Sequence, residues 1–220
     1  MSRMYRFRGW LLTLCATVSL SACATAPVKP SAMEAASPRS ILIVPVVNQS
    51  LNVTAPDYFL ATISRPLADK GYYVFPVNAV KRLLEDDGLS DADLVHSAPT
   101  PRLARLFGAD AVLYVSIERW DARYLVFATQ VTVQLSYVIK DGRTDQVLWQ
   151  NRQTIVYQPD TSNSGNPLVN LAVNAVNAAI TKAAPNYLPL ARQANQQAFS
   201  SREIPPGPYA FEESSSRAAR

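Results

Sequence analysis

The sequence predicts an α/β (α+β) fold, in which helices pack on a mixed sheet of about five strands that ends in a C-terminal antiparallel meander. Residues 41–44 are a continuous apolar run, typical of a strand buried on both faces. Residues 130–138 alternate between apolar and polar side chains, which indicates a half-buried strand. Helical patterns lie between these strands and return after the meander, an order that favours a sheet layered with helices.

The first elements are a strand and a helix. Pro45 follows the apolar run and lacks a backbone donor, so this end of the strand is not expected to pair on both sides. Thr54, with Asp57 three residues later, resembles a capping box, although Glu or Gln is usual at the third position. The helix that follows is expected to kink at Pro66 and to end at Gly71.

Three shorter elements follow. Residues 72–75 predict a short strand, and Asn78 is expected to cap a second helix. Thr100–Pro101 opens a third, short helix that ends at Phe107–Gly108.

The next part of the chain predicts three antiparallel strands. The first covers residues 109–120. The second covers residues 130–138 and places Val131, Val133, Leu135 and Tyr137 on one face. The segment Lys140–Arg143 predicts a tight type I′ hairpin turn, because its Asp-Gly pair tolerates positive φ. The returning strand runs from about Val147 to Gln158.

Two helices are predicted after the meander, about 167–182 and about 187–197, and all helices together are expected to cover one face of the sheet. The first carries an uncharged polar stripe on a single side, because its members are spaced by four, three and four residues. One interpretation is an ordinary solvent-facing side. The other is an interface with a partner or a second copy, since interface cores are depleted in charge. The members are Asn170, Asn174, Asn177 and Thr181.

The N-terminus has the pattern of a secretory signal peptide. Three arginines precede an apolar run of about 12 residues, and small residues precede a cleavage position after Ala22. The run is too short to span a bilayer, which takes about 20 apolar residues. Leu20-Ser21-Ala22-Cys23 resembles a bacterial lipobox, and this resemblance implies that Cys23 is acylated and becomes the new N-terminus. A chance cysteine beside an ordinary cleavage site is the alternative.

The chain is expected to have four parts. Residues 1–22 are a signal peptide, and residues 23–39 are the lipidated N-terminus and a flexible tether, because they lack periodic apolar positions. Residues 40–199 form the folded domain. Residues 200–220, rich in Pro and Ser, are expected to be a disordered tail.

Charge and cysteine usage exclude several classes of function. The signal carries three of the 21 basic residues and none of the 17 acidic ones, so the mature chain has a net charge of about +1. This balance argues against nucleic-acid binding. Only Cys23 of the two cysteines remains after processing, which excludes an intrachain disulfide, a thiol nucleophile in the domain and a multi-cysteine metal site.

The sequence offers little for catalysis. His96, the single histidine, lies in a predicted polar loop beside Asp91 and Asp93. A general base or a metal site there is a weaker hypothesis than a solvated loop, because a metal needs more ligands. Nucleophile-elbow, phosphate-loop and dinucleotide motifs do not occur in the sequence. We therefore expect no enzyme activity, no catalytic residue, no metal and no cofactor.

Four segments, in order, resemble the TolB N-terminal-like superfamily, which includes CsgG. They are Ile41–Pro45 with Asn48, Gly71–Val77, Leu106–Val112 and Asp141–Trp149. The match covers about residues 40–198. It is closer still to a family of bacterial outer-membrane lipoproteins of unknown function that is related to that superfamily.

The resemblance implies a palmitate-type lipid anchor on the periplasmic face of the outer membrane, because Ala24 and not Asp follows the acylated cysteine. It implies action by protein–protein contact in envelope assembly or secretion, with a CsgG-like lipoprotein or a second copy of this chain as partner. One alternative is an LpoB-like regulator of peptidoglycan synthesis, for which a tether of at most about 55 Å is short. Another is a small-ligand-binding or enzymatic envelope protein.

Overall fold

The computed structural model describes residues 30–125, 128–157 and 187–210 of the 220-residue chain. The chain divides into two compact units, Met1–Pro30 and Ser31–Arg220. The elements below all belong to the second unit.

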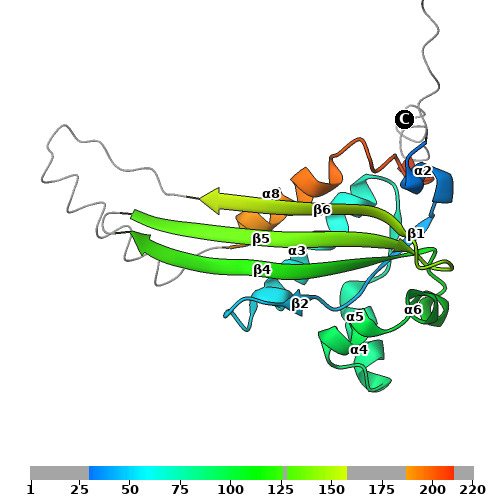
Figure 1. The fold of residues 1–220 in the computed structure, drawn as a ribbon, viewed down its shortest axis with the longest axis horizontal. Helices are drawn as coiled ribbons and strands as arrows, with labels where there is room; N and C mark the ends of the chain where they lie inside the picture. The colour runs from blue at the N-terminus through cyan, green and yellow to red at the C-terminus, as the bar shows by residue number, and fades with distance from the viewer. Residues whose placement is uncertain (1–29, 126–127, 158–186, 211–220) are drawn as a thin grey trace, which may run out of the picture. The chain divides into compact units, whose positions relative to one another are not determined.

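Six strands form one open, mixed sheet (Figure 1). They are β1 (Ser40–Ile43), β2 (Val47–Asn48), β3 (Tyr73–Val74), β4 (Ala111–Leu125), β5 (Ala128–Asp141) and β6 (Val147–Tyr157). The order is β3-β1-β4-β5-β6, with β2 also paired to β4; the pairs among β1–β4 are parallel, and β4, β5 and β6 form an antiparallel meander. The predicted fold class is confirmed. The additional strand is β2, where the chain pairs with β4 again after Pro45.

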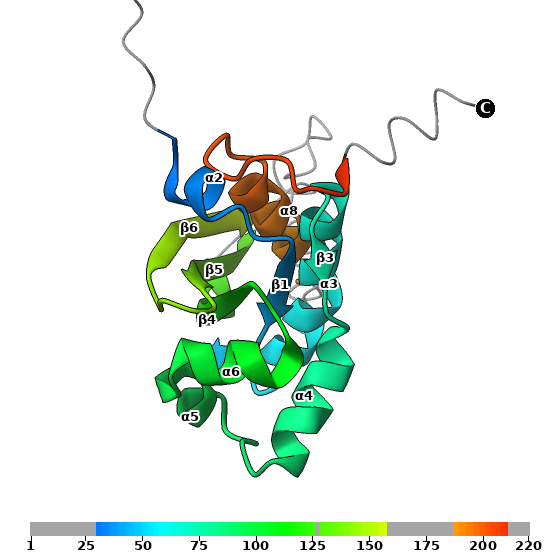
Figure 2. The same ribbon diagram turned by 90° about the vertical axis from the view of Figure 1, so that its right-hand side faces the viewer.

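Helices cover both faces of the parallel half of the sheet, so the expectation of a single covered face is wrong. One face packs against α2 (Ala32–Ala36), α3 (Ala55–Asp69) and α8 (Leu188–Phe199). The other packs against α4 (Val77–Asp86), α5 (Ala92–Ser97) and α6 (Thr100–Phe107), which lie below the sheet in Figure 2. The physical reason is the apolar run of β1. Ile41 and Ile43 point to the first face and Leu42 and Val44 to the second, and both faces need a cover.

The alternation predicted for β5 is confirmed. Its four apolar residues, Val131, Val133, Leu135 and Tyr137, are each at most 1% exposed. They lie under α8, which turns a line of small residues toward them. These are Ala191, Ala194 and Ala198, all fully buried. Small side chains allow a helix to approach a sheet closely, which leaves room for the large aromatic side chains of this core.

Two predicted helix caps are wrong, and one predicted helix has the expected bounds. Thr54 makes no capping bond; its backbone N–H and Oγ1 donate to Asn52 Oδ1 at 3.0 and 2.8 Å. Asn78 lies inside α4, whose first turn follows Pro76. Helix α6 begins and ends as predicted, because Gly108 adopts the left-handed conformation (φ 71°) that stops it.

The turn between β5 and β6 is longer than the predicted type I′ turn. The carboxylate of Asp141 organises it, accepting from the backbone N–H groups of Arg143 and Thr144 at 2.9 and 2.8 Å. The residue with positive φ is Asp145 (61°), not Gly142. Glycine is needed at 142 for a different reason: a Cβ there would lie 2.7 Å from the carbonyl oxygen of Asp110.

An ordered helix lies within the segment that the sequence assigns to the tether. Ser31 and Glu34 form a complete capping box at the start of α2. Met33 of this helix is fully buried in the core. A single buried methionine gives no periodic pattern, which is why the sequence did not reveal this helix.

The structure also differs from the predicted disordered tail, because residues 200–210, here called the C-terminal strap, pack on the end of α3. Ile204 is 1% exposed. Lys70 Nζ donates to the carbonyl oxygens of Ser201 and Ile204 at 3.2 and 2.9 Å. The backbone N–H groups of Gly207 and Tyr209 donate to the carbonyl oxygens of residues 70 and 71 at 2.8 and 3.0 Å. These partners are far away in sequence, so composition alone suggested disorder.

A chain of polar contacts crosses the core between β5, α8 and α3. The hydroxyl of Tyr137 donates to Asn195 Oδ1 at 2.7 Å, and Asn195 Nδ2 donates to Thr62 Oγ1 at 2.9 Å. Asn195 is fully buried. Burial raises the pKa of Tyr137 well above its ordinary value, so its hydroxyl remains a donor. The contacts satisfy a buried amide and set the register between α8 and the sheet.

We expect Tyr137→Phe to lower the free energy of unfolding by about 1–3 kcal/mol, because it leaves Asn195 Oδ1 buried without its donor. Urea unfolding of the mature chain measures this loss. Tyr157→Phe is the matched control, since Tyr157 is 49% exposed, and a change within about 0.5 kcal/mol is expected there. Equal losses in the two variants would contradict a role for this hydrogen bond.

Candidate functional site

The residues that the sequence singles out for function lie outside the described residues. Cys23 and Ala22 belong to residues 1–29, and the stripe of Asn170, Asn174, Asn177 and Thr181 belongs to residues 158–186. Their roles therefore stay predictions.

Among the described residues, the loop between β2 and α3, residues 49–54, is the candidate functional site. Leu51 is fully solvent-exposed (103%) and Val53 is 86% exposed, the two highest values among the large apolar side chains in the part of the chain that the structure describes. Two such side chains in one short loop are a candidate contact surface, because a partner that covered them would remove apolar surface from water.

Hydrogen bonds between the polar residues of the loop hold it in place. Asn48 Oδ1 accepts from the backbone N–H and the hydroxyl of Ser50 at 3.1 and 2.7 Å. Asn48 Nδ2 donates to the carbonyl oxygen of Asn52 at 2.8 Å. Asn52 Oδ1 in turn accepts from the backbone N–H and hydroxyl of Thr54. The polar residues at 48, 50, 52 and 54 fix the backbone while 51 and 53 face the solvent.

The loop is also connected to the core through Tyr187. The ring of Tyr187 stacks on Trp120 of β4, with centroids 5.2 Å apart and planes inclined by 29°. Burial raises the pKa of Tyr187, the negative charge of Asp121 adds to this, and a hydrogen bond with Asn52 opposes it. These contacts hold the loop against the core. Little conformational entropy of the loop therefore remains to be lost when a partner binds it.

The loop is not among the sites predicted from the sequence, although its residues carry a recognisable pattern. Asn, Ser, Asn and Thr at alternate positions 48, 50, 52 and 54 are the residue types that form side-chain-to-backbone turns. The pattern favours an ordered turn with outward apolar residues between its polar ones. The local sequence does not tell whether another segment of the chain packs over Leu51 and Val53.

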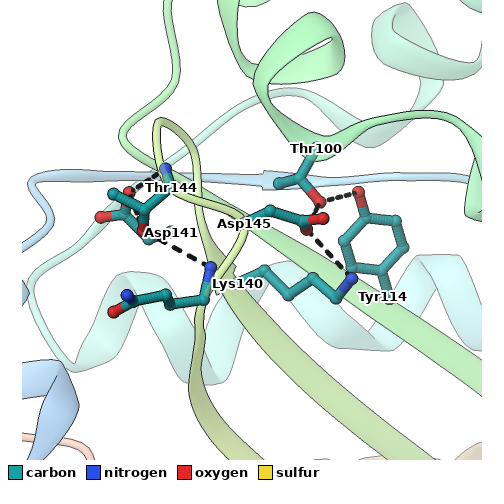
Figure 3. A network of polar contacts seen from close by, with 7 residues as sticks. Thr100, Tyr114, Lys140, Asp141, Thr144 and Asp145 are labelled. Carbon is teal, nitrogen blue, oxygen red and sulfur yellow. Dashed lines mark hydrogen bonds and ion pairs between the residues drawn. The ribbon is translucent and has the colours of Figure 1, made fainter.

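A second group of polar side chains joins α6, β4 and the β5–β6 turn (Figure 3). Thr100 Oγ1 lies 2.9 Å from the hydroxyl of Tyr114 and donates to Asp145 Oδ1, which also accepts from Lys140 Nζ at 3.0 Å. The hydrogen bond from Thr100 and then the contact with Lys140 hold the pKa of Asp145 below its ordinary value. Each polar group is occupied by another of the set, so the cluster acts as a brace between elements.

His96 lies in α5 and not in the polar loop that the sequence predicts. Asp91 caps this helix, accepting from the backbone N–H of Asp93 at 2.7 Å. His96 Nε2 is 2.9 Å from the carbonyl oxygen of Pro45, and because that oxygen only accepts, Nε2 carries the proton. Burial lowers the pKa of His96, while the Pro45 carbonyl and the charge of Asp93 oppose the shift. The imidazole therefore fastens α5 to the segment between β1 and β2.

A groove of about 760 Å³ lies between α3 and α8. Its charged lining residues are Arg65, Asp69, Lys70 and Arg192. Arg65 and Asp69 form an exposed ion pair at 3.5 Å, and Lys70 is held by the C-terminal strap. Burial lowers the pKa of Lys70. Because much of this charge is already used within the domain, the groove offers few convergent groups for a small ligand.

Within residues 30–125, 128–157 and 187–210, no group of three or more His, Cys, Asp or Glu side chains could hold a metal ion. In the same ranges, no helix combines the length and apolar character needed to cross a bilayer.

Comparison with known proteins identifies relatives. The family model described as "Putative lipoprotein GNA1162-like" matches residues 28–208. A protein of Neisseria meningitidis serogroup B, described as "Putative lipoprotein NMB1124/NMB1162", is 32% identical over 176 residues, which cover 78% of this chain and 82% of that protein.

One solved structure of a relative shows the same fold. The crystal structure of lipoprotein GNA1162 from Neisseria meningitidis aligns with a TM-score of 0.54 and 33% identity, over 66% of this chain and 99% of that one. A PelC dodecamer from Paraburkholderia phytofirmans aligns with a TM-score of 0.46 and 13% identity, over 83% and 95% of the two chains.

The Asp141 turn generates a prediction about pH. Burial raises the pKa of Asp141, but hydrogen bonds from Thr144 and Arg143 outweigh this effect and hold the pKa below its ordinary value. Asp141 therefore stabilises the fold above its unfolded pKa, and this contribution is lost as the pH falls through the folded pKa. Thr144→Val removes one donor, 3.0 Å away. We expect a loss of about 1–2 kcal/mol at neutral pH.

In the same variant the pKa of Asp141 moves back toward its ordinary value, so less stability is lost on acidification than in the wild type. Urea unfolding at neutral pH and at about pH 3 measures both effects. Thr154→Val, at an exposed position of β6, is the control. If Thr144→Val loses as much unfolding free energy between neutral pH and about pH 3 as the wild type does, Thr144 does not set the pKa of Asp141.

Proposed function

The chain belongs to the GNA1162-like family of lipoproteins, and from this we propose that it is a membrane-anchored, periplasm-side lipoprotein that acts by protein–protein contact in envelope assembly or secretion. The family match over residues 28–208 is the observation that carries the proposal. The lipobox-like Leu20–Cys23 lies just before the matched residues, where an anchor for such a domain is expected.

The proposed anchor is acylated Cys23 at the outer membrane. More than one acyl chain is needed for stable attachment, since a single chain binds a membrane only marginally. Acyl chains on both the sulfur and the new amino group of Cys23 would meet this requirement. Ala24, next to the anchor, favours the outer membrane over retention at the inner one, as the resemblance to lipoproteins implies.

Contact with another protein is supported by the loop of residues 49–54. It presents Leu51 and Val53 on a backbone that side-chain hydrogen bonds already order. Burying two such side chains is worth about 1.5–3 kcal/mol each, enough to dominate a modest interface. We propose a CsgG-like envelope lipoprotein, or a second copy of this chain, as the partner. A non-enzymatic role is supported by His96 and the Figure 3 residues, whose polar atoms serve to join secondary-structure elements.

An LpoB-like regulator of peptidoglycan synthesis is less well supported. Such a role calls for a long connection between anchor and domain. Here Ser31, the eighth residue after Cys23, already caps α2 of the domain, so the connection is shorter than the sequence suggested.

We expect Cys23→Ala to abolish labelling by radioactive palmitate and to leave the precursor unprocessed, because the acylated sulfur is lost. Fractionation of the envelope, with the mass of the product, measures both. Cys15→Ala is the matched control, since Cys15 lies in the signal peptide, and it should be processed and labelled like the wild type. A Cys23→Ala protein that is labelled and processed normally would end the anchor hypothesis.

Leu51→Asp combined with Val53→Asp should remove a crosslinked partner complex in intact envelopes without lowering the unfolding free energy by more than about 0.5 kcal/mol, because both side chains are exposed. Leu94→Asp, at a 55% exposed position in α5, is the control and should retain the complex. A complex that survives the double substitution would place the contact elsewhere.

A further inference from the structure

The connection between the proposed anchor and the folded domain is very short. Ser31 is the eighth residue after Cys23. A fully extended chain of this length reaches at most about 29 Å. Ser31 is already part of the domain, since its hydroxyl accepts from the backbone N–H of Glu34 at 3.1 Å and its own N–H donates to the Glu34 carboxylate at 2.8 Å.

Several contacts prevent α2 from unwinding to lengthen this connection. Met33 is fully buried in the core. After the helix, the backbone N–H groups of Arg39 and Ser40 both donate to Asp110 Oδ2, at 2.9 and 3.0 Å. Releasing the helix would expose the fully buried methionine to water, which opposes the release. Eight residues are therefore the effective length of the tether.

The C-terminal strap lies beside α2 at the same end of the domain, as both ribbon views show (Figures 1 and 2). Ser31 Oγ donates to the carbonyl oxygen of Glu203 at 3.5 Å. Tyr72 donates from its hydroxyl to the carbonyl oxygen of Pro205 at 2.7 Å. Arg39 lies over the ring of Tyr209, 5.8 Å from its centroid. We call this end, formed by α2 and the strap, the base of the domain.

The meander extends away from the base. Strand β4 begins next to β1, where Ala111 pairs with Ile41 and Asp110 holds Ser40. It continues without interruption of its pairing with β5 to Leu125, apart from one bulge after Ile117. At about 3.3 Å per residue, Leu125 lies about 45 Å along the strand from Ala111, which follows the Asp110 that binds Arg39 and Ser40.

We propose that the base faces the phospholipid surface that holds acylated Cys23, and that the β4–β5 hairpin points away from it. This rests on the proposed acylation. An inverted domain would require about 29 Å of chain to pass along about 45 Å of sheet, which it cannot do. Lipid is the occupant because the anchor itself lies in the bilayer and the tether keeps the base next to it.

The orientation also places the loop of residues 49–54. Strand β2 pairs with Ser116 and Ile117, about 20 Å along β4 from Ala111. Leu51 and Val53 are thus held above the bilayer surface, on the side of the domain, where a partner can reach them.

Energy transfer to lipid tests the orientation in the lipidated full chain. Cys23 is the only cysteine after the signal, and its acylated sulfur does not react with thiol reagents, so one introduced cysteine can carry a donor dye. Ala35→Cys labels the base, and Arg123→Cys, whose side chain is 63% exposed, labels the far part of β4. The protein is reconstituted into vesicles of phosphatidylethanolamine and phosphatidylglycerol with acceptor-labelled headgroups. Transfer from position 35 should exceed that from position 123 at least about twofold, given the lengths above.

A second pair of variants carries a Gly/Ser insertion of about 20 residues between Lys29 and Pro30, which gives the tether enough length to reach round the domain. In that pair the two efficiencies should become similar. Equal transfer from the two positions without the insertion would overturn the orientation while leaving the anchor intact. A difference that persists after insertion would overturn the tether as its cause. Absence of the acyl mass on Cys23 would overturn both the proposed function and the orientation.

Discussion

Burial of β1 on both of its faces is the constraint on which the rest of the domain depends. Four consecutive apolar residues, 41–44, cannot be covered by one layer of helices, because successive side chains of a strand point to opposite sides. The chain therefore supplies α3 and α8 for one face and α4 to α6 for the other. The second group brings His96 to Pro45 and Thr100 to Tyr114, and so creates the polar braces around β4.

The meander relies on the same core but has a different role. Its apolar face is covered by α8, whose three alanines allow the close approach, and the Tyr137–Asn195–Thr62 contacts hold that helix in register. On the opposite face, Glu118 of β4 links all three strands, since it accepts from Gln134 of β5 at 2.6 Å and pairs with Arg152 of β6 at 2.7 Å. One face is thus built for burial and the other for water, as is usual in antiparallel sheets.

The candidate site shows what local sequence can and cannot reveal. The polar residues 48, 50, 52 and 54 form an ordered turn through hydrogen bonds between residues two to four positions apart. Such a turn can be predicted from the local sequence. The exposure of Leu51 and Val53 depends on which elements pack nearby, and the contact of the loop with Tyr187 joins residues more than 130 positions apart in the chain. Ser31 and Glu203, which meet at the base, are 172 residues apart. Contacts between residues so far apart produce no periodic pattern in the sequence, so the sequence does not predict them.

The sequence by itself determined the class of fold, the buried face of β5 and the end of α6 at Gly108, because each follows from side-chain alternation or from the backbone freedom of one residue. Tertiary structure alone decided that helices lie on both sides of β1 and that Gly142 serves close approach and not positive φ. It also decided that Met33 and Ile204 are core residues. The physical reason is that burial and steric contact are properties of pairs of segments, and the partner of each segment becomes known only when the chain has folded.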